Sequence, residues 1–298
     1  MRCLVAGGTG FIGRHLVQKL ENPVVLGRNK ERIQNLFSHV TPQQWTPGKP
    51  IDSRVFDDCD TIINLAGDSL YNERWNSAKK KRILDSRVNT TQAIVAALEK
   101  LPEPPKTFIS TSAIGYYGSR GDEQLTESAS AGSDFLSGVC VAWENEAREA
   151  EKLGVRVILL RIGVVLGKDG GALEQMLLPF KLGLGGRLGN GKQYMSWIHI
   201  EDMTGLILYA AENKNMHGPY NAVSPQPVTN SEFTKTLAAA LHRPAFLPVP
   251  GLGLKIALGE FANVLLGSQK VIPEKVIQSG FSYTFPNLED ALADLIKS

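Results

Sequence analysis

A glycine-rich turn near the N-terminus is the segment best suited to hold a phosphate group. It reads Gly7-Gly8-Thr9-Gly10-Phe11-Ile12-Gly13 and follows directly on the apolar run Cys3-Leu4-Val5-Ala6. Glycines at the first, fourth and seventh positions let the backbone turn tightly, let a pyrophosphate approach the main chain and let the next helix pack close to its strand. Such spacing is a weak signal alone, but the strand before it and the helical stretch after it supply the required context. The turn therefore predicts a dinucleotide ligand.

The residues after the second expected strand indicate which dinucleotide this is. The apolar run Val24-Val25-Leu26 is the second expected strand, and Gly27 and Arg28 follow it. An NAD enzyme commonly places an acidic residue here on the adenosine ribose, whereas an NADP enzyme supplies an arginine for the 2′-phosphate. An arginine binds phosphate through two parallel charge-assisted hydrogen bonds. The sequence favours NADP(H); the alternative is that Arg28 is an exposed loop residue, as Lys30 and Arg32 could equally be.

Small or polar residues end two further expected strands. Residues 61–67 end in Leu65-Ala66-Gly67, and residues 108–112 end in Ser112. In open parallel sheets the ligand crevice lies beyond the carboxyl ends of the strands. We therefore expect these residues to border the same crevice as the glycine turn.

A long helix is expected between those two strands, from about residue 76 to residue 100. Its first half carries Lys79-Lys80-Lys81-Arg82, and a run of like charges on a helix is typical of a solvated face. Arg87, one to two turns further on, is the residue of this helix that we expect to contribute to a phosphate site.

The composition is that of a soluble globular enzyme. Of the 298 residues, 43% are hydrophobic and 21% are charged, and the net charge of +2 is too small to imply nucleic acid or an anionic membrane surface as a partner. The three cysteines, Cys3, Cys59 and Cys140, lack paired spacing, which favours reduced thiols, a cytoplasmic location and no metal site. We expect no signal peptide and no membrane span.

The order of strand-like and helix-like segments predicts a Rossmann-type, doubly wound parallel sheet with a smaller C-terminal α/β substrate lobe. We expect the dinucleotide-binding core to comprise residues 1–166, with parts of 192–230 returning to it. The substrate lobe would then be 167–298, including a module that begins at about residue 248. Within this lobe the glycine-rich segment 183–194 carries Arg187 and Lys192, which suit either a lid that meets an anionic substrate or an inert surface loop.

Several motifs follow the glycine turn in a fixed order: Asn64-Leu65-Ala66-Gly67, Ser110-Thr111-Ser112 followed by Tyr116-Tyr117-Gly118, and Trp197-Ile198-His199-Ile200-Glu201-Asp202. Together with the turn, they resemble an extended short-chain dehydrogenase/reductase of the NAD-dependent epimerase/dehydratase type. Ser86-Arg87, residues 161–167, Leu177-Leu178-Pro179-Phe180 and Gly267-Ser268-Gln269 resemble an atypical branch whose bacterial members are labelled YfcH-like or cell-division-inhibitor-like. That branch ends in a module of unknown function.

The resemblance implies which residues hold the cofactor. NADP(H) would be bound by the turn from Gly7 to Gly13, by Arg28, Leu65, Ala66, Gly67 and Arg87, and by the backbone near Val165. His199 and Asp202 match a stretch that in this superfamily ties the substrate lobe to the sheet, and we expect His199 to be structural. A small-molecule substrate of unknown identity is implied, and a homodimer or another protein partner stays open.

The chain departs from the family at its usual catalytic pair. Typical members use Tyr-x-x-x-Lys on the helix after the serine strand, where the lysine lowers the pKa of the tyrosine so that it can exchange a proton. With Glu144 as the anchor, these two positions fall on Leu136 and Cys140. Neither side chain can replace the pair.

Three alternatives follow from this departure. The protein could be an NADP-dependent oxidoreductase or epimerase that uses other groups, of which Ser112, Tyr116 and Tyr117 are available; Ser112 and Tyr117 are our catalytic candidates. It could bind NADP(H) without turnover and report nucleotide state to a partner. It could use Cys140 as a nucleophile, although a helical cysteine is more often a small buried hydrophobe.

Overall fold

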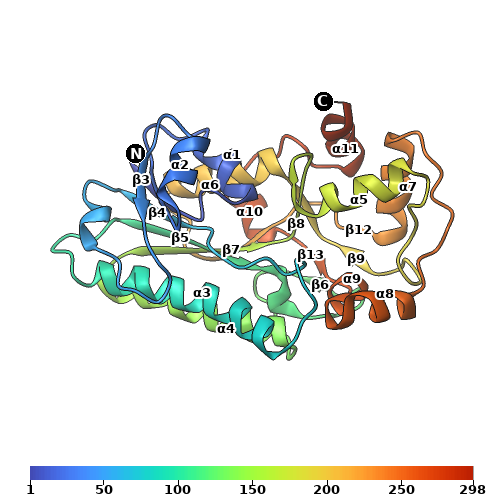
Figure 1. Cartoon of the computed structure of the whole chain (residues 1–298), viewed down its shortest axis with the longest axis horizontal. Coiled ribbons are helices and arrows are strands. Elements are labelled where there is room, and N and C mark those ends of the chain that lie inside the picture. Colours follow the sequence, from blue (N-terminus) through green and yellow to red (C-terminus); the bar gives the residue numbers. More distant parts are fainter. Residues whose placement is uncertain (298) are drawn as a thin grey trace.

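A seven-stranded parallel sheet forms the centre of the computed structural model, which describes residues 1–297 (Figure 1). Its strands are β1 (Cys3–Ala6), β2 (Val24–Gly27), β3 (Thr41–Gln44), β4 (Thr61–Asn64), β5 (Thr107–Ala113), β7 (Arg156–Ile162) and β11 (Gly218–Ala222). Their order is β11-β7-β5-β4-β1-β2-β3. The chain adds strands outward on one side of β1 up to β3 and then crosses to the other side of β1 to add β4. All residues of β1 and β4 are buried, as is usual for a parallel sheet covered on both faces. The predicted Rossmann-type α/β fold is confirmed.

Helices cover both faces of this sheet (Figure 1). One face carries α1 (Phe11–Val17), α2 (Lys30–Leu36) and α6 (Ile200–Glu212), and the other carries α3 (Ser77–Leu98) and α4 (Phe135–Arg148). Short 3-10 turns are η1 (Ser53–Phe56), η2 (Ile114–Tyr117) and η3 (Glu149–Leu153). Side-chain caps start α3 and α4, where Asn76 accepts from the Lys79 N–H and Asp134 accepts from the Ser137 N–H, both at 2.8 Å. Among the helices of residues 1–297, none combines the length and apolar character needed to cross a lipid bilayer.

A smaller lobe lies beside the carboxyl edge of the sheet, on the right in Figure 1. It contains α5 (Gly171–Lys181), β9 (Tyr194–Met195), β12 (Val228–Thr229), α7 (Asn230–Ala240), α8 (Gly251–Leu258), η4 (Gly259–Phe261) and α9 (Ala262–Leu266). The strand β8 (Val164–Gly167) leads into the lobe and pairs in parallel with β10 (Trp197–His199), which leads back to α6. After β10, α6 packs against β5 and β11 pairs with β7 at the edge of the main sheet.

The C-terminal segment returns from the lobe to the core. Its elements are β13 (Lys270–Val271), α10 (Glu274–Gln278) and α11 (Leu288–Lys297), and β13 pairs with β6 (Gln124–Leu125). The carboxylate of Asp202 on α6 accepts hydrogen bonds from the Thr284 N–H at 2.7 Å and the Phe285 N–H at 2.9 Å. His199 caps α6 by accepting from the Glu201 N–H, and its ring lies 4.0 Å from that of Phe285. These contacts fasten the C-terminal segment to α6 and to the end of β10.

Candidate functional site

The glycine turn connects β1 to α1 at the carboxyl edge of the sheet. Gly7 has a φ of +80°, and a Cβ atom there would lie 2.8 Å from the carbonyl carbon of Leu65. A Cβ on Gly13 would lie 2.4 Å from the Gly7 carbonyl oxygen, so α1 could not approach the turn this closely with any other residue. No side chain caps α1, because its N-cap is Gly10. No side chain therefore competes for the first N–H groups of α1, which is the condition that phosphate binding at a helix terminus needs.

The remaining residues of the turn have two kinds of surroundings. Gly8 is buried against the side chain of Val25, whereas Thr9 and Ile12 are partly exposed. The ring of Phe11 packs where Gly167, Gly170 and Gly171 leave room; a Cβ on any of these three glycines would lie 2.4–2.8 Å from it.

Contacts between α1 and the start of the lobe reinforce this packing. The Arg14 guanidinium donates to the Asp169 carbonyl oxygen at 3.0 Å, and the His15 ring contacts the Asp169 carboxylate at 3.0 Å. Val165, on β8 just before this turn, is buried and pairs with Ile198. The dinucleotide turn and the first turn of the lobe are thus joined directly.

Arg28 lies beside the glycine turn. Ala6 pairs with Leu26, so Arg28 follows β2 by one residue at the level where the turn leaves β1. The side chain is exposed, and no hydrogen bond or ion pair within residues 1–297 engages its guanidinium. Lys30 and Arg32 are exposed as well. The position is open to an anionic group.

The loop that follows β4 faces the glycine turn. Asn64, which is fully buried, accepts from the Ala66 N–H at 3.2 Å and donates to the Thr91 hydroxyl at 2.9 Å. The Asn64 side chain therefore fixes the backbone of Leu65 and Ala66 against α3. We did not assign Asn64 to the site from the sequence, although a polar residue at the end of an apolar strand was a usable signal.

Arg87, on α3, is hydrogen-bonded to the same loop. Its guanidinium donates to the Asp68 carbonyl oxygen at 3.1 Å and to the Ile83 carbonyl oxygen at 3.0 Å, and lies over the Trp143 ring. A Cβ on Gly67 would lie 3.2 Å from the central carbon of this guanidinium, and burial lowers the pKa of Arg87. The structure thus shows Arg87 in contact with backbone carbonyl groups and with the side chains of Ser86 and Trp143, and its contact with a phosphate stays a prediction.

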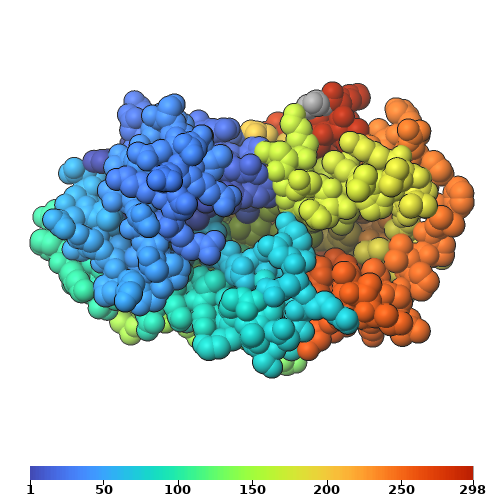
Figure 2. Space-filling view, viewed as in Figure 1, coloured from blue at the N-terminus to red at the C-terminus, as the bar shows by residue number. Residues whose placement is uncertain are grey.

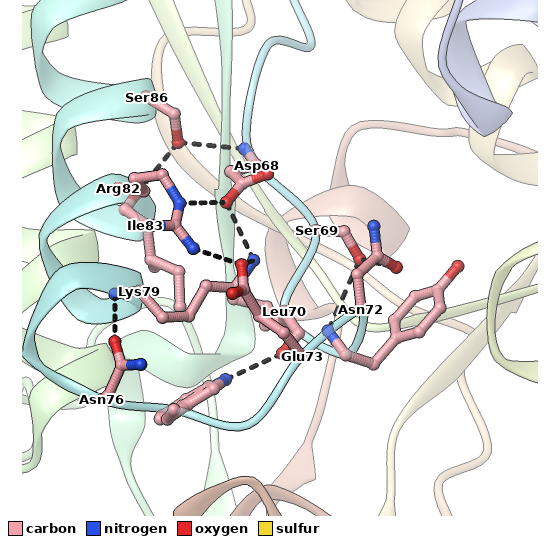
Figure 3. Close-up of polar contacts among 12 residues, drawn as sticks. Asp68, Ser69, Leu70, Asn72, Glu73, Asn76, Lys79, Arg82, Ile83 and Ser86 are labelled. Atoms are coloured by element: carbon pink, nitrogen blue, oxygen red, sulfur yellow. Dashed lines mark hydrogen bonds and ion pairs between the residues drawn. The ribbon is translucent and has the colours of Figure 1, made fainter.

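A cluster of charged residues holds the segment from Asp68 to Asn76 against α3 (Figure 3). The Lys79 ammonium donates to the Asp68 carboxylate at 2.8 Å and lies 3.5 Å from the Glu73 carboxylate, which also pairs with Arg82. The Asp68 N–H donates to the Ser86 hydroxyl at 2.9 Å. Burial opposes the charge of Asp68, but the hydrogen bond and charge of Lys79 outweigh it and lower the pKa of that carboxyl group.

The predicted solvated face is wrong for Lys79, whose side chain is 1% exposed. The rest of the run is more exposed: Lys80 pairs with Glu260 of the lobe, and Lys81 pairs with Asp85. The cause is the loop before the helix, which places two carboxylates over the first turn of α3.

Ser112 and Tyr117 lie in one buried hydrogen-bond network. The Ser112 hydroxyl donates to Glu144 at 2.7 Å, and Glu144 accepts two further bonds from Arg161 at 2.8 and 2.9 Å. Arg161 also donates to the Tyr117 hydroxyl at 3.0 Å, and that hydroxyl donates to Asn221 at 2.6 Å. The network joins β5, η2, α4, β7 and β11.

This environment bears on the chemistry of both residues. Tyr117 is fully buried and Ser112 is 3% exposed. Burial raises the pKa of Tyr117 to about 12, so its phenol holds its proton near neutral pH. Burial also acts against the charge of Arg161, but the hydrogen bonds that Arg161 donates to Glu144 outweigh it and raise the pKa of that guanidinium. In this arrangement the hydroxyl groups of Ser112 and Tyr117 are both hydrogen-bonded to buried side chains of the protein.

The segment 183–194 is fastened to the rest of the lobe. A Cβ on Gly186 would overlap the Leu247 carbonyl oxygen, and the Gly189 N–H donates to the Val249 carbonyl oxygen at 2.9 Å. Arg187 is exposed and donates to the Asn190 carbonyl oxygen at 3.1 Å, and Lys192 is exposed. The backbone contacts favour a fixed wall over a freely moving lid.

The sequence matches two known protein-family models. Residues 3–223 match the family model described as the NAD dependent epimerase/dehydratase family. The chain belongs to this family. Residues 249–295 match a second model, a domain of unknown function numbered 1731, which confirms the expected C-terminal module.

Relatives match over the whole chain. The epimerase family protein YfhF of Bacillus subtilis is 40% identical over 99% of this chain and 98% of its own. The mouse epimerase family protein SDR39U1 is 40% identical over 99% of this chain and 100% of its own. The crystal structure of the human protein SDR39U1 with NADPH has a TM-score of 0.90 at 37% identity and covers 100% of this chain and 99% of that chain.

Leu136 and Cys140 of α4 are the residues that the sequence analysis aligned with the usual tyrosine and lysine, and this alignment stays a prediction. Leu136 packs beneath Gly115, and the Cys140 thiol donates to the Ala113 carbonyl oxygen at 3.7 Å. Burial raises the pKa of Cys140 to about 11. Cys140 is therefore a buried thiol, and this setting does not generate a thiolate nucleophile.

Proposed function

We propose that the protein binds NADP(H) and acts as an oxidoreductase or epimerase-like protein on a small molecule without the usual tyrosine and lysine pair. The observation that carries the proposal is the exposed, unengaged guanidinium of Arg28 beside the glycine turn, with no acidic residue at the end of β2. The NADPH-bound human relative supports it. Figure 2 shows a hollow between the core, in blue and cyan, and the lobe, in yellow-green and orange, where a substrate would meet the cofactor.

The residues at the carboxyl edge of the sheet suit this cofactor. Backbone N–H groups from Gly7 to Gly13 would bind the pyrophosphate, Arg28 would bind the 2′-phosphate, and Leu65, Ala66 and Gly67 would line the crevice. We further propose that Arg87 and the Val165 backbone complete this site. When bound, the nicotinamide ring supplies hydride exchange with the substrate, while the chain positions it and excludes water.

Ser112 and Tyr117 remain our candidates for proton exchange, and each would have to leave its partner in the buried network to act. General acid or base assistance is worth about 10²- to 10⁴-fold. We therefore expect slow turnover. The test follows NADPH absorbance with carbonyl compounds and sugar nucleotides, using the native protein and the variants Ser112→Ala and Tyr117→Phe. Loss of turnover in one variant supports a catalytic role for the residue replaced in it. Turnover kept in both variants excludes a catalytic role for both residues.

A second candidate function is a non-catalytic NADP(H) sensor. It is favoured by the engagement of both hydroxyls and by Leu136 and Cys140 at the positions of the usual pair. Assignment to the YfcH-like branch would connect such a sensor with cell division. Tight NADPH binding with no turnover across the same substrates supports the sensor, and any turnover by the purified protein refutes it.

Location and assembly complete the proposal. Three free, buried cysteines suit the reducing cytoplasm. We infer a small-molecule ligand as the main partner, and a homodimer or a protein partner would be detected by the mass of the particle in solution.

A further inference from the structure

A pocket of about 380 Å³ lies in the lobe between the segment 183–193 and α8. Leu252 and Leu266 provide its apolar wall, and Asn190, Gln193 and Lys255 provide its polar groups. Gln193 already donates to the Leu188 and Leu265 carbonyl oxygens, at 3.1 and 3.3 Å. Lys255 is the one charged residue among those that line the pocket, and its side chain is exposed.

The part of the apolar wall that α8 provides is largely uncovered by the protein itself, whereas Leu266 is partly buried. The helix α8 reads Gly-Leu-Gly-Leu-Lys-Ile-Ala-Leu, yet none of its residues is buried, and Leu252 is 72% exposed. Covering such a side chain with an apolar ligand is favourable in proportion to the area removed from water. The pocket therefore suits a ligand with an apolar body.

The pocket also lies close to the carboxyl edge of the sheet. Leu266 of the pocket wall precedes Gln269 by three residues, and the Gln269 amide donates to the Ile114 carbonyl oxygen at 2.9 Å. Ile114 directly follows β5. Three residues span at most about 10 Å, and the Gln269 side chain spans the rest of the distance to Ile114, so a ligand would have to extend over both to reach the end of β5.

We propose that this pocket binds the distal part of the substrate, and that the substrate is an amphiphile with an apolar body and a single anionic group such as a carboxylate. The apolar body covers Leu252 and Leu266, and the anion pairs with Lys255. A nucleoside diphosphate carries more than one negative charge, whereas this pocket offers one cation. The inference rests on the proposed function, because it names the substrate class of the same site.

The test measures binding of octanoate, 1-octanol and UDP to the full-length protein saturated with NADPH, by calorimetry. We expect octanoate to bind more tightly than UDP. Lys255→Gln should weaken octanoate roughly two- to fivefold, the range for an exposed ion pair, and leave 1-octanol unchanged. Leu252→Ser should weaken both ligands. Both substituted side chains are exposed, so folding is preserved.

Matched controls are Lys235→Gln on α7 and Ile277→Ser on α10, which alter exposed side chains that do not line the pocket. Tighter binding of UDP than of octanoate would overturn the inference, as would equal octanoate affinity in Lys255→Gln and Lys235→Gln. Failure of NADPH itself to bind is a separate result, since it refutes the proposed function before any amphiphile is added.

Discussion

Replacing Glu144 with glutamine should destabilise the protein strongly, because Glu144 is the centre of the buried network. Glu144 is 4% exposed and its partner Arg161 is 3% exposed, and the carboxylate accepts bonds from Arg161 and from Ser112. Glu144→Gln removes the counter-charge and leaves a buried guanidinium uncompensated. Breaking a buried ion pair in this way costs about 3–5 kcal/mol, a large part of the stability of a typical protein.

The assay is urea unfolding of the nucleotide-free protein, followed by tryptophan fluorescence and by circular dichroism. Ser112→Ala removes one neutral donor to the same carboxylate and should cost less, about 1–2 kcal/mol. The double variant Glu144→Leu with Arg161→Met leaves no charge unpaired, so its free energy of unfolding should fall less than that of Glu144→Gln alone. A loss below about 1 kcal/mol for Glu144→Gln would refute our account of the network, since an uncompensated guanidinium could not then be buried there.

Three further expectations concern the turn, the thiols and a histidine. Gly13→Ala should lower the melting temperature and abolish NADPH binding, because the added methyl group would lie 2.4 Å from the Gly7 carbonyl oxygen; normal binding by this variant would show that α1 can move away. Burial raises the pKa of Cys59 and Cys140 to about 11 and that of Cys3 to about 12, so iodoacetamide at pH 8 should label the native protein far more slowly than the unfolded one, and rapid labelling of Cys140 would contradict this. Burial lowers the pKa of His199 below its ordinary 6.5 despite nearby carboxylates. The unfolded chain therefore takes up more protons on acidification, and the free energy of unfolding should fall as the pH drops below 6.5. Melting temperatures measured from pH 7 to pH 5 should show this fall, and a smaller one in His199→Gln.

Local patterns predicted the parts of the fold that depend on neighbouring residues. The apolar run of β1, the glycine turn and the start of α1 are set within a dozen residues, and the family motifs identified the epimerase-type core. The helix after the glycine turn ends at Val17, where the Lys19 and Leu20 N–H groups donate to the carbonyl oxygens three residues earlier. Such a boundary depends on packing that no local pattern encodes.

The sequence did not predict how the buried polar groups are satisfied. Ser112, Glu144 and Arg161 are 17 or more residues apart and become partners only when β5, α4 and β7 pack together. The burial of Lys79 likewise depends on two carboxylates in the irregular loop before α3. Residue type suggested reactive or solvated groups, whereas the tertiary surroundings make them structural.

Titration of the purified protein with NADPH and NADH, with Arg28→Gln and the neighbouring control Lys30→Gln, tests the central claim most directly. Charge-assisted bonds from arginine to phosphate are worth about 1.5–3 kcal/mol. We predict that the native protein prefers NADPH, that Arg28→Gln weakens NADPH at least about tenfold without changing NADH, and that Lys30→Gln changes neither. Binding of neither nucleotide, or equal weakening of both by Arg28→Gln, would contradict the account.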